Sequence, residues 1–345
     1  MVVTLDDTKR LAIGQALADM KVLQNLIISF DQQLIQGCTD GDIRKRLQDM
    51  LNDDQKNMGV LDTVIVQYGV KADPRSATHK IVEQGQKMME DSEFSLFEKT
   101  AQLELLKHAQ VGKGLIVHKC AQVVGADIEA AIGPLNAVNF ENRAHQEQLK
   151  GILEILGVRE LTGQEPDQGL WGRVQDAVAA LSGVVGSAVT QASGMSDMTI
   201  GQILRMDHSK AKTLFMEIEN SNDPQKIQEY FGQLYKDLMA HAKAEEQVVY
   251  PSVRSYYEDT QDLYNEQAEQ ARMLDEIKAM SPSSPEFKNK VRQLRDATNH
   301  HINQEENQML PKLDSHFNSE QQQRMATEFK SAKSKFQDEM AASSK

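Results

Sequence analysis

Two stretches of the chain share one pattern of charged residues. Residues 241–251 read HAKAEEQVVYP, and residues 301–311 read HINQEENQMLP. Both fit HxxxEExxxxP. On an α-helix, a histidine and a glutamate four positions later project from the same face. The repeat therefore predicts two helices, each presenting one imidazole and one carboxylate.

Two such helices that face each other can build a metal site in the core of a helical bundle. The carboxylates can bridge two metal ions, while the imidazoles hold one ion each. Mixed imidazole and carboxylate ligation suits iron, manganese or zinc. The two cysteines, Cys38 and Cys120, form no CxxC pair, so an iron–sulfur or other soft-ligand site is a poor fit.

A third imidazole fits the same site. His208 lies in LRMDHSK and follows an apolar stripe, so it should face inward on its helix. A single histidine on an apolar stripe is more often a core residue with a hydrogen-bond partner. The doubled motif elsewhere in this half of the chain favours ligation instead.

The segments LRMDHSKAKTLF, HAKAEEQVVYP and HINQEENQMLP resemble the hemerythrin-like HHE cation-binding family over about 197–340. The resemblance implies an up-and-down four-helix bundle with a carboxylate-bridged di-iron centre, two irons per domain, with manganese or zinc as alternatives. Carried over residue by residue, it implies the ligands His208, His241, Glu245, His301 and Glu305.

The predicted third helix of this bundle departs from the family pattern, which places a histidine there. Residues 265–271 read NEQAEQA, and Gln270 aligns with the expected histidine. We expect Glu269 to act as the ligand in its place, with Glu266, Gln270 or a water as alternatives. One metal would then be under-ligated, which argues against plain O2 carriage and leaves a position open for reaction.

The composition predicts an all-α protein of two domains. Good helix formers dominate, aromatic residues are only 5% of the 345, and long stretches lack proline and glycine. Residues 1–160 predict a ferritin-like up-and-down bundle. Residues 161–196 predict a Gly/Ala/Ser-rich linker with a short small-residue helix, and residues 197–345 predict a hemerythrin-like bundle with a C-terminal helix and tail. In the second bundle, Asp223 should cap a helix that starts at Pro224.

The first bundle resembles a ferritin-like stress-protein domain in its length, its helix count and its ending HQEQLKGILEILGV. Two same-face pairs on its third and fourth predicted helices, Glu104 with His108 and Glu141 with His145, form a candidate second metal site. A ferritin-like site also needs glutamate on the first helix and Glu-x-x-His on the second, and the sequence has neither. The alternative is a bundle without metal, used for dimerisation or to present the second domain.

The net charge of −13 argues against nucleic-acid binding and against docking on anionic membranes. The N-terminus, MVVTLDDTKR, does not resemble a signal peptide. The sequence also has no apolar run of about 18 residues, the length that would span a membrane. We therefore expect a cytoplasmic protein that has no nucleic-acid or membrane partner.

These features predict a non-haem di-iron protein of the oxidative or metal stress response, reacting with or sensing O2, peroxide or nitric oxide. The sequence shows no flavin, haem or dinucleotide motif, so electrons would come from an external donor. The alternatives are a non-enzymatic iron-binding or buffering protein and a structural oligomer whose metal mainly stabilises the fold. The small-residue linker suggests a homo-oligomer.

Overall fold

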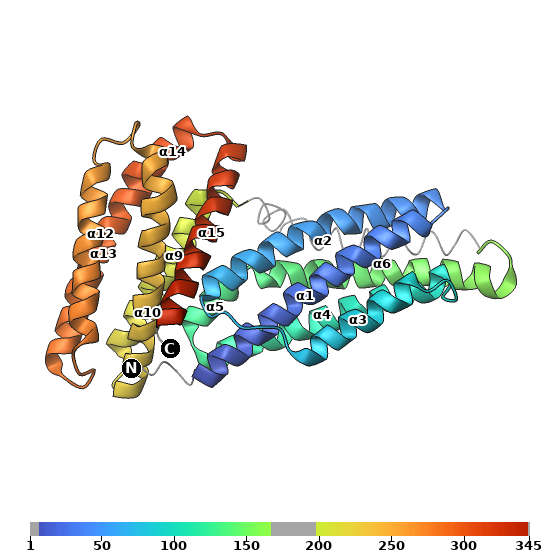
Figure 1. Ribbon diagram of the computed structural model, residues 1–345, viewed down its shortest axis with the longest axis horizontal. Coiled ribbons are helices and arrows are strands. Elements are labelled where there is room, and N and C mark those ends of the chain that lie inside the picture. Colours follow the sequence, from blue (N-terminus) through green and yellow to red (C-terminus); the bar gives the residue numbers. More distant parts are fainter. Residues whose placement is uncertain (1–6, 167–197, 344–345) are drawn as a thin grey trace.

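The computed structural model describes residues 7–166 and 198–343, and every element in these two ranges is a helix. The predicted all-α class is therefore confirmed. The helices form two bundles whose axes cross steeply, with one end of the N-terminal bundle against the side of the C-terminal bundle (Figure 1). The small-residue helix predicted within residues 161–196 lies largely outside the described residues.

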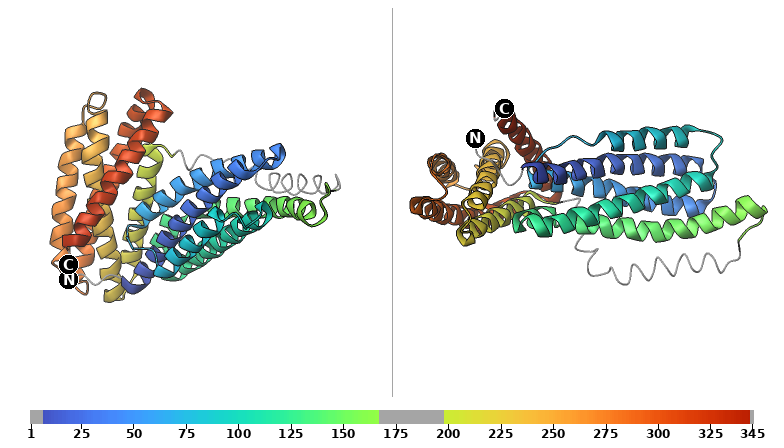
Figure 2. Two further views of the ribbon diagram at one scale, coloured as in Figure 1. Left: turned by 45° about the vertical axis from the view of Figure 1, so that its right-hand side comes forward. Right: turned by 90° about the horizontal axis from the view of Figure 1, so that it is seen from below.

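The N-terminal bundle is elongated (Figure 2). Its α2 is bounded by local signals: the Asp40 side chain accepts from the backbone N–H groups of Asp42 and Ile43, and Gly69 ends the helix in the left-handed conformation with φ +75°, as glycine does readily. The described helices of this bundle are α1 Asp7–Gly37, α2 Gly41–Tyr68, α3 Ser76–Glu90, α4 Leu96–Val124, α5 Ala126–Ile132 and α6 Leu135–Thr162.

One helix of the N-terminal bundle, Thr8–Gly37, is long and apolar enough to cross a membrane by length and composition. Half of its most apolar window is buried inside the protein. Its inward side chains, among them Leu23, Ile27 and Phe30, pack in the core of the bundle. This burial is what a core helix of a bundle shows.

The C-terminal bundle contains the repeated motifs. Asp223 caps α10 and Pro224 is its first residue, as predicted, and Ser284 caps α13. The last helix packs against α9, α10 and η1 and continues through Ser343 into the predicted tail. The described helices are α9 Ile200–Asn220, α10 Pro224–Ala244 with η1 Glu245–Val249 and α11 Tyr250–Val253, α12 Thr260–Lys278, α13 Pro285–Gln304 with η2 Glu305–Met309 and α14 Leu310–His316, and α15 Ser319–Ser343.

Each repeated motif contains one wide, π-helical turn. These turns, η1 and η2, begin at Glu245 and at Glu305, the glutamates of the two HxxxE pairs. π-helical turns are rare and occur frequently at functional sites. The sequence repeat is therefore also a repeat of local backbone structure.

The C-terminal end of α2 docks against the second bundle. The buried Lys210 side chain on α9 donates to the carbonyl oxygens of Gln67 at 2.6 Å and Tyr68 at 3.3 Å. On α15, Gln337 donates to the carbonyl oxygen of Val66 at 3.1 Å. Carbonyls that a helix leaves unpaired at its end are thus satisfied by the other bundle.

Candidate metal centre

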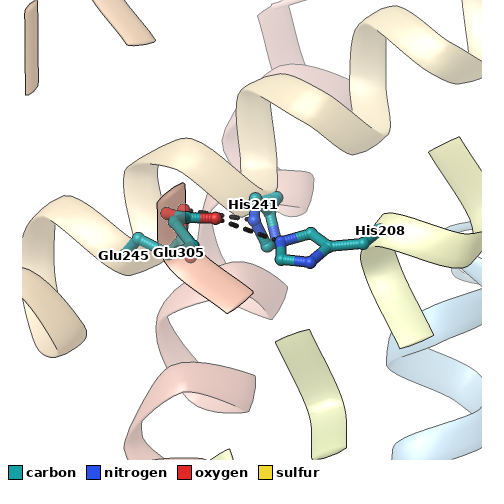
Figure 3. Close-up of side chains that lie close together, drawn as sticks. All are labelled: His208, His241, Glu245 and Glu305. Atoms are coloured by element: carbon teal, nitrogen blue, oxygen red, sulfur yellow. Dashed lines mark ion pairs between the residues drawn. The ribbon is translucent and has the colours of Figure 1, made fainter. Parts of the chain in front are cut away.

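Four side chains of ligand type meet in the core of the C-terminal bundle (Figure 3). His208 comes from α9, His241 from α10, and Glu245 and Glu305 from the two π-helical turns. All four are buried, and one ligand atom from each lies within 4.8 Å of the others. They are four of the five ligands implied by the resemblance, and the structure brings them to one place.

His301, the fifth implied ligand, reaches the same cluster from α13. Its Nε2 lies 3.3 Å from Glu305 Oε1. The other two imidazoles also present Nε2 to a carboxylate: His208 lies 3.1 Å from Glu305 Oε2, and His241 lies 3.1 Å from Glu245 Oε2. Three imidazoles therefore converge through the same ring atom on two glutamates.

A carboxylate behind each imidazole holds it through the other ring nitrogen, Nδ1. In metal proteins such a partner fixes the orientation of the ring and leaves Nε2 free for the metal. Glu266, one of the alternatives for the missing ligand, is such a partner here. The pairs are His208 with Glu306 at 2.7 Å, His241 with Asp207 at 2.9 Å, and His301 with Glu266 at 2.7 Å.

The carboxylates control the protonation of the cluster. Burial lowers the pKa of His241, but Glu245 and Asp207 outweigh this and raise it to about 10. Burial also lowers the pKa of His301, and Glu305 with Glu245 raises it to about 9. Without metal, these imidazoles hold protons that neutralise the glutamates. A bound cation would displace the protons.

Several inward-facing atoms of the cluster lack a hydrogen-bond partner. Glu245 Oε1 has none, and His208 Nε2 and Glu305 Oε2 lie 3.1 Å apart as an ion pair without hydrogen-bond geometry. Buried polar atoms are seldom left unpaired. Imidazole nitrogens and carboxylate oxygens in this position are the donors that iron, manganese or zinc would take. The residues therefore fit a metal centre.

The third helix of the bundle presents Gln267 to the cluster. Its Nε2 donates to Glu245 Oε2 at 2.7 Å. Gln270, three positions later on the same helix face, is buried and accepts from Thr298 at 2.9 Å. The expected ligand Glu269 is exposed and lies away from the other ligands. It follows Gln267 by two positions, which is about 200° around an α-helix.

A small cavity adjoins the cluster. Its volume is about 40 Å³, and each enclosed water needs roughly 10–15 Å³ measured in this way. It therefore has room for a few waters or for one small molecule. Its lining includes His208, His241, His301, Gln267 and Gln270.

Helix α15 completes the site. Lys333 Nζ lies 2.6 Å from Asp207 Oδ1, and Asp207 in turn holds His241. The Phe329 ring packs edge-on against His241, with 5.8 Å between ring centroids. Sequence reasoning missed all three residues. Asp207 had a visible signal, since it directly precedes His208, but nothing in the sequence of α15 indicates these contacts.

The candidate second site in the N-terminal bundle does not assemble. Glu104 Oε1 and His108 Nδ1 both contact Gln146 Nε2, at 3.3 and 2.8 Å, and His108 is exposed. His145 is buried, with its Nδ1 3.0 Å from Lys107 Nζ, and Glu141 is half-buried. Within residues 7–166, no three ligand-type side chains converge as they do in the C-terminal bundle.

A fully buried lysine lies in the core of the N-terminal bundle. The fully buried Lys107 ammonium pairs with Asp54 and lies 3.0 Å from His145 Nδ1. Asp31 is buried beside this pair, and burial and Asp54 raise its pKa well above the usual value. The buried charge of this bundle is thus balanced by a side chain of its own.

Comparison with known proteins agrees with the geometry. Residues 199–313 match the hemerythrin HHE cation binding domain. A DNA nickase of Nostoc sp. (strain PCC 7120 / SAG 25.82 / UTEX 2576) is 61% identical over 339 residues, which cover 98% of this chain and 97% of the relative. The chain belongs to the same family as this nickase.

A more distant relative matches only the HHE region. It is an uncharacterized hemerythrin-like protein of Schizosaccharomyces pombe, 24% identical over 139 residues, which cover 39% of this chain and 68% of that protein. No solved structure matches the chain. The domain match ends at Leu313, before α15, and does not enter the N-terminal bundle, whose ferritin-like character remains a prediction. The HHE domain and its buried cluster indicate metal binding.

Proposed function

We propose that this protein binds two irons in its HHE domain and nicks duplex DNA. The observation that carries the proposal is the 61% identity to the Nostoc DNA nickase over nearly the full length of both chains. Both bundles are included in this similarity. The buried His/Glu cluster supplies the metal ligands, and manganese or zinc would suit them as well.

The charge of the chain is the argument against a DNA substrate. A net charge of −13 repels the phosphate backbone and predicts weak binding to nucleic acid. A nicking enzyme needs only brief local contact with the DNA backbone. Few phosphate contacts give only a shallow loss of affinity with salt, and salt screens the repulsion between an acidic protein and DNA, so the assay belongs at physiological ionic strength.

The centre itself admits only small molecules. Its ligands are buried, and the adjoining cavity of about 40 Å³ is far too small for a nucleotide. Iron held there would supply redox chemistry toward O2, peroxide or nitric oxide. The chain's residues orient the imidazoles, hold their protons and exclude bulk water. This cavity favours a second candidate function, the sensing or removal of small oxidants in oxidative or metal stress.

Plasmid nicking tests the first function. Iron-loaded protein should convert supercoiled plasmid to open circles, and His241→Ala should abolish this by removing a ligand. The matched control is His316→Ala, an exposed histidine of the same bundle that stacks on Tyr256. No nicking by the wild type would refute the proposal. Nicking by His241→Ala at the wild-type rate would show that the centre takes no part.

Oxygen dependence separates the two candidates. If the centre makes the cutting agent from a small oxidant, nicking should stop without O2 or peroxide and should need an external reductant. If the protein consumes peroxide but does not nick DNA, only the stress role is supported. If the protein shows neither reaction, iron buffering or a structural role is the function left. We also propose a cytoplasmic location and a homo-oligomeric state. Both cysteines are free, as is usual in the reducing cytoplasm.

A further inference from the structure

We infer that Tyr250 is a metal ligand, whose phenolic oxygen takes the position that the third helix leaves without a histidine. The inference rests on the metal centre proposed above. It names a ligand chemistry, phenolate, that the HxxxE repeat does not contain. Tyr250 would then be the additional ligand beside His301.

The π-helical turn η1 brings Tyr250 into the centre. Tyr250 follows Glu245 by five positions, and on an α-helix two such residues point about 140° apart. Here the backbone N–H of Tyr250 donates to the carbonyl oxygen of Glu245, the i→i+5 bond of a π-helix. The wider turn puts both side chains on one face. The Tyr250 side chain is fully buried.

The phenolic oxygen is spaced like a ligand from its neighbours. It lies 2.7 Å from Glu305 Oε1, 3.3 Å from Glu245 Oε2 and 3.2 Å from His301 Nε2. Oxygen and nitrogen ligands bind such metals at about 2.0–2.2 Å, so adjacent ligands of one ion lie roughly 3 Å apart. These three atoms are therefore the nearest candidate co-ligands for an ion held by the phenolic oxygen.

The two carboxylate oxygens of Glu305 face different candidate ligands. Glu305 Oε2 faces His208, and Glu305 Oε1 faces His301 and Tyr250. A bound metal pair would therefore be held by His208 and His241 on one side of Glu305 and by His301 and Tyr250 on the other. To bind metal, the Tyr250 phenol would give up its proton to solvent.

The rest of the site supports this position for Tyr250. Gln267 on α12 donates to the phenolic oxygen at 2.6 Å, so the residue on the third helix holds the tyrosine. The position equivalent to Tyr250 in the second motif is Leu310, which is buried in the apolar core. Only one of the two motifs therefore supplies an additional ligand.

Spectroscopy of the iron-loaded full-length chain tests the inference. The ferric wild type should show a visible phenolate-to-iron charge-transfer band with tyrosine ring vibrations in its resonance Raman spectrum. Tyr250→Phe should lose both and hold about one iron fewer per chain. The matched control is Tyr264→Phe, since the two ring centroids lie 5.0 Å apart but the Tyr264 hydroxyl donates to the backbone oxygen of Glu246.

A second variant covers poor folding of the phenylalanine variant. Tyr250→His keeps a ligand without a phenol, so it should keep its iron and lose the band. A band that survives in either Tyr250 variant would overturn the inference, as would an iron-loaded wild type without a band, and neither result touches the nicking proposal. A wild type that takes up no iron would overturn both.

Discussion

Lys107 is the residue on which the N-terminal bundle depends for its buried charge balance. Asp54 and Asp31 lie beside it in the core, and Gln24 donates to Asp54 Oδ1 at 2.9 Å. Burial raises the pKa of Asp54, but Lys107 and His145 outweigh this and keep it below the usual value. The aspartate therefore stays charged because the lysine is there.

Replacing Lys107 by methionine should lower the free energy of unfolding by about 3–5 kcal/mol, because a buried carboxylate loses its counter-charge. Denaturant unfolding of the full chain measures the loss. Lys119→Met on the exposed side of the same helix is the control and should change little. Adding Asp54→Asn to Lys107→Met should restore much of the stability. An unchanged free energy of unfolding in Lys107→Met would contradict this role of Lys107.

Four of the five candidate ligands could be proposed from the sequence because each HxxxE pair is a pattern within one helix, and His208 follows from its apolar stripe and the family resemblance. The carboxylate partners could not, since Glu266 and His301 meet only when two helices pack in a particular register. The same limit applies to α12, where Gln267 rather than Gln270 donates to Glu245. Tyr250 escaped notice because a regular α-helix would turn it away from Glu245.

Among the elements, α15 contacts the candidate metal centre although the HHE match ends before it. Its Lys333 reaches Asp207, and its Phe329 contacts His241. The sequence predicted this helix from its apolar pattern but gave it no role. Amphipathic periodicity shows that a helix packs and leaves open what it packs against.

Lys333→Met should weaken metal binding by about 10–100-fold, the usual effect of losing a residue that orients a ligand. Competition with a chelator measures the affinity. Lys335→Met, two residues along on the exposed side of the helix, is the control and should bind as the wild type does. Equal affinity in the two variants would show that Asp207 holds His241 without help from α15.

At the scale of the whole molecule, the two bundles dock through the end of α2. Lys210 satisfies the carbonyls of Gln67 and Tyr68 and also pairs with Asp237 at 2.9 Å. Two residues before it in α9 is His208. The helix that supplies the first ligand of the centre is thus also the helix that holds the N-terminal bundle. The sequence indicated two domains but not this contact, which depends on three-dimensional proximity.

Lys210→Met should destabilise the chain by about 1–3 kcal/mol, because the buried carbonyls lose their donor. The loss should appear in thermal unfolding and as faster proteolysis between the bundles. Lys212→Met, on the exposed face of α9, provides the comparison and should unfold as the wild type does. If both variants unfold alike, the docking contact does not contribute to stability.

We propose that the C-terminal bundle holds two irons between His208, His241, Glu245, His301 and Glu305. The most direct test is the iron content per chain of the purified protein, by elemental analysis, for the wild type and for His301→Ala. We predict about two irons in the wild type and at least one fewer in the variant. No iron in the wild type after reconstitution, or equal iron in both proteins, would contradict the account.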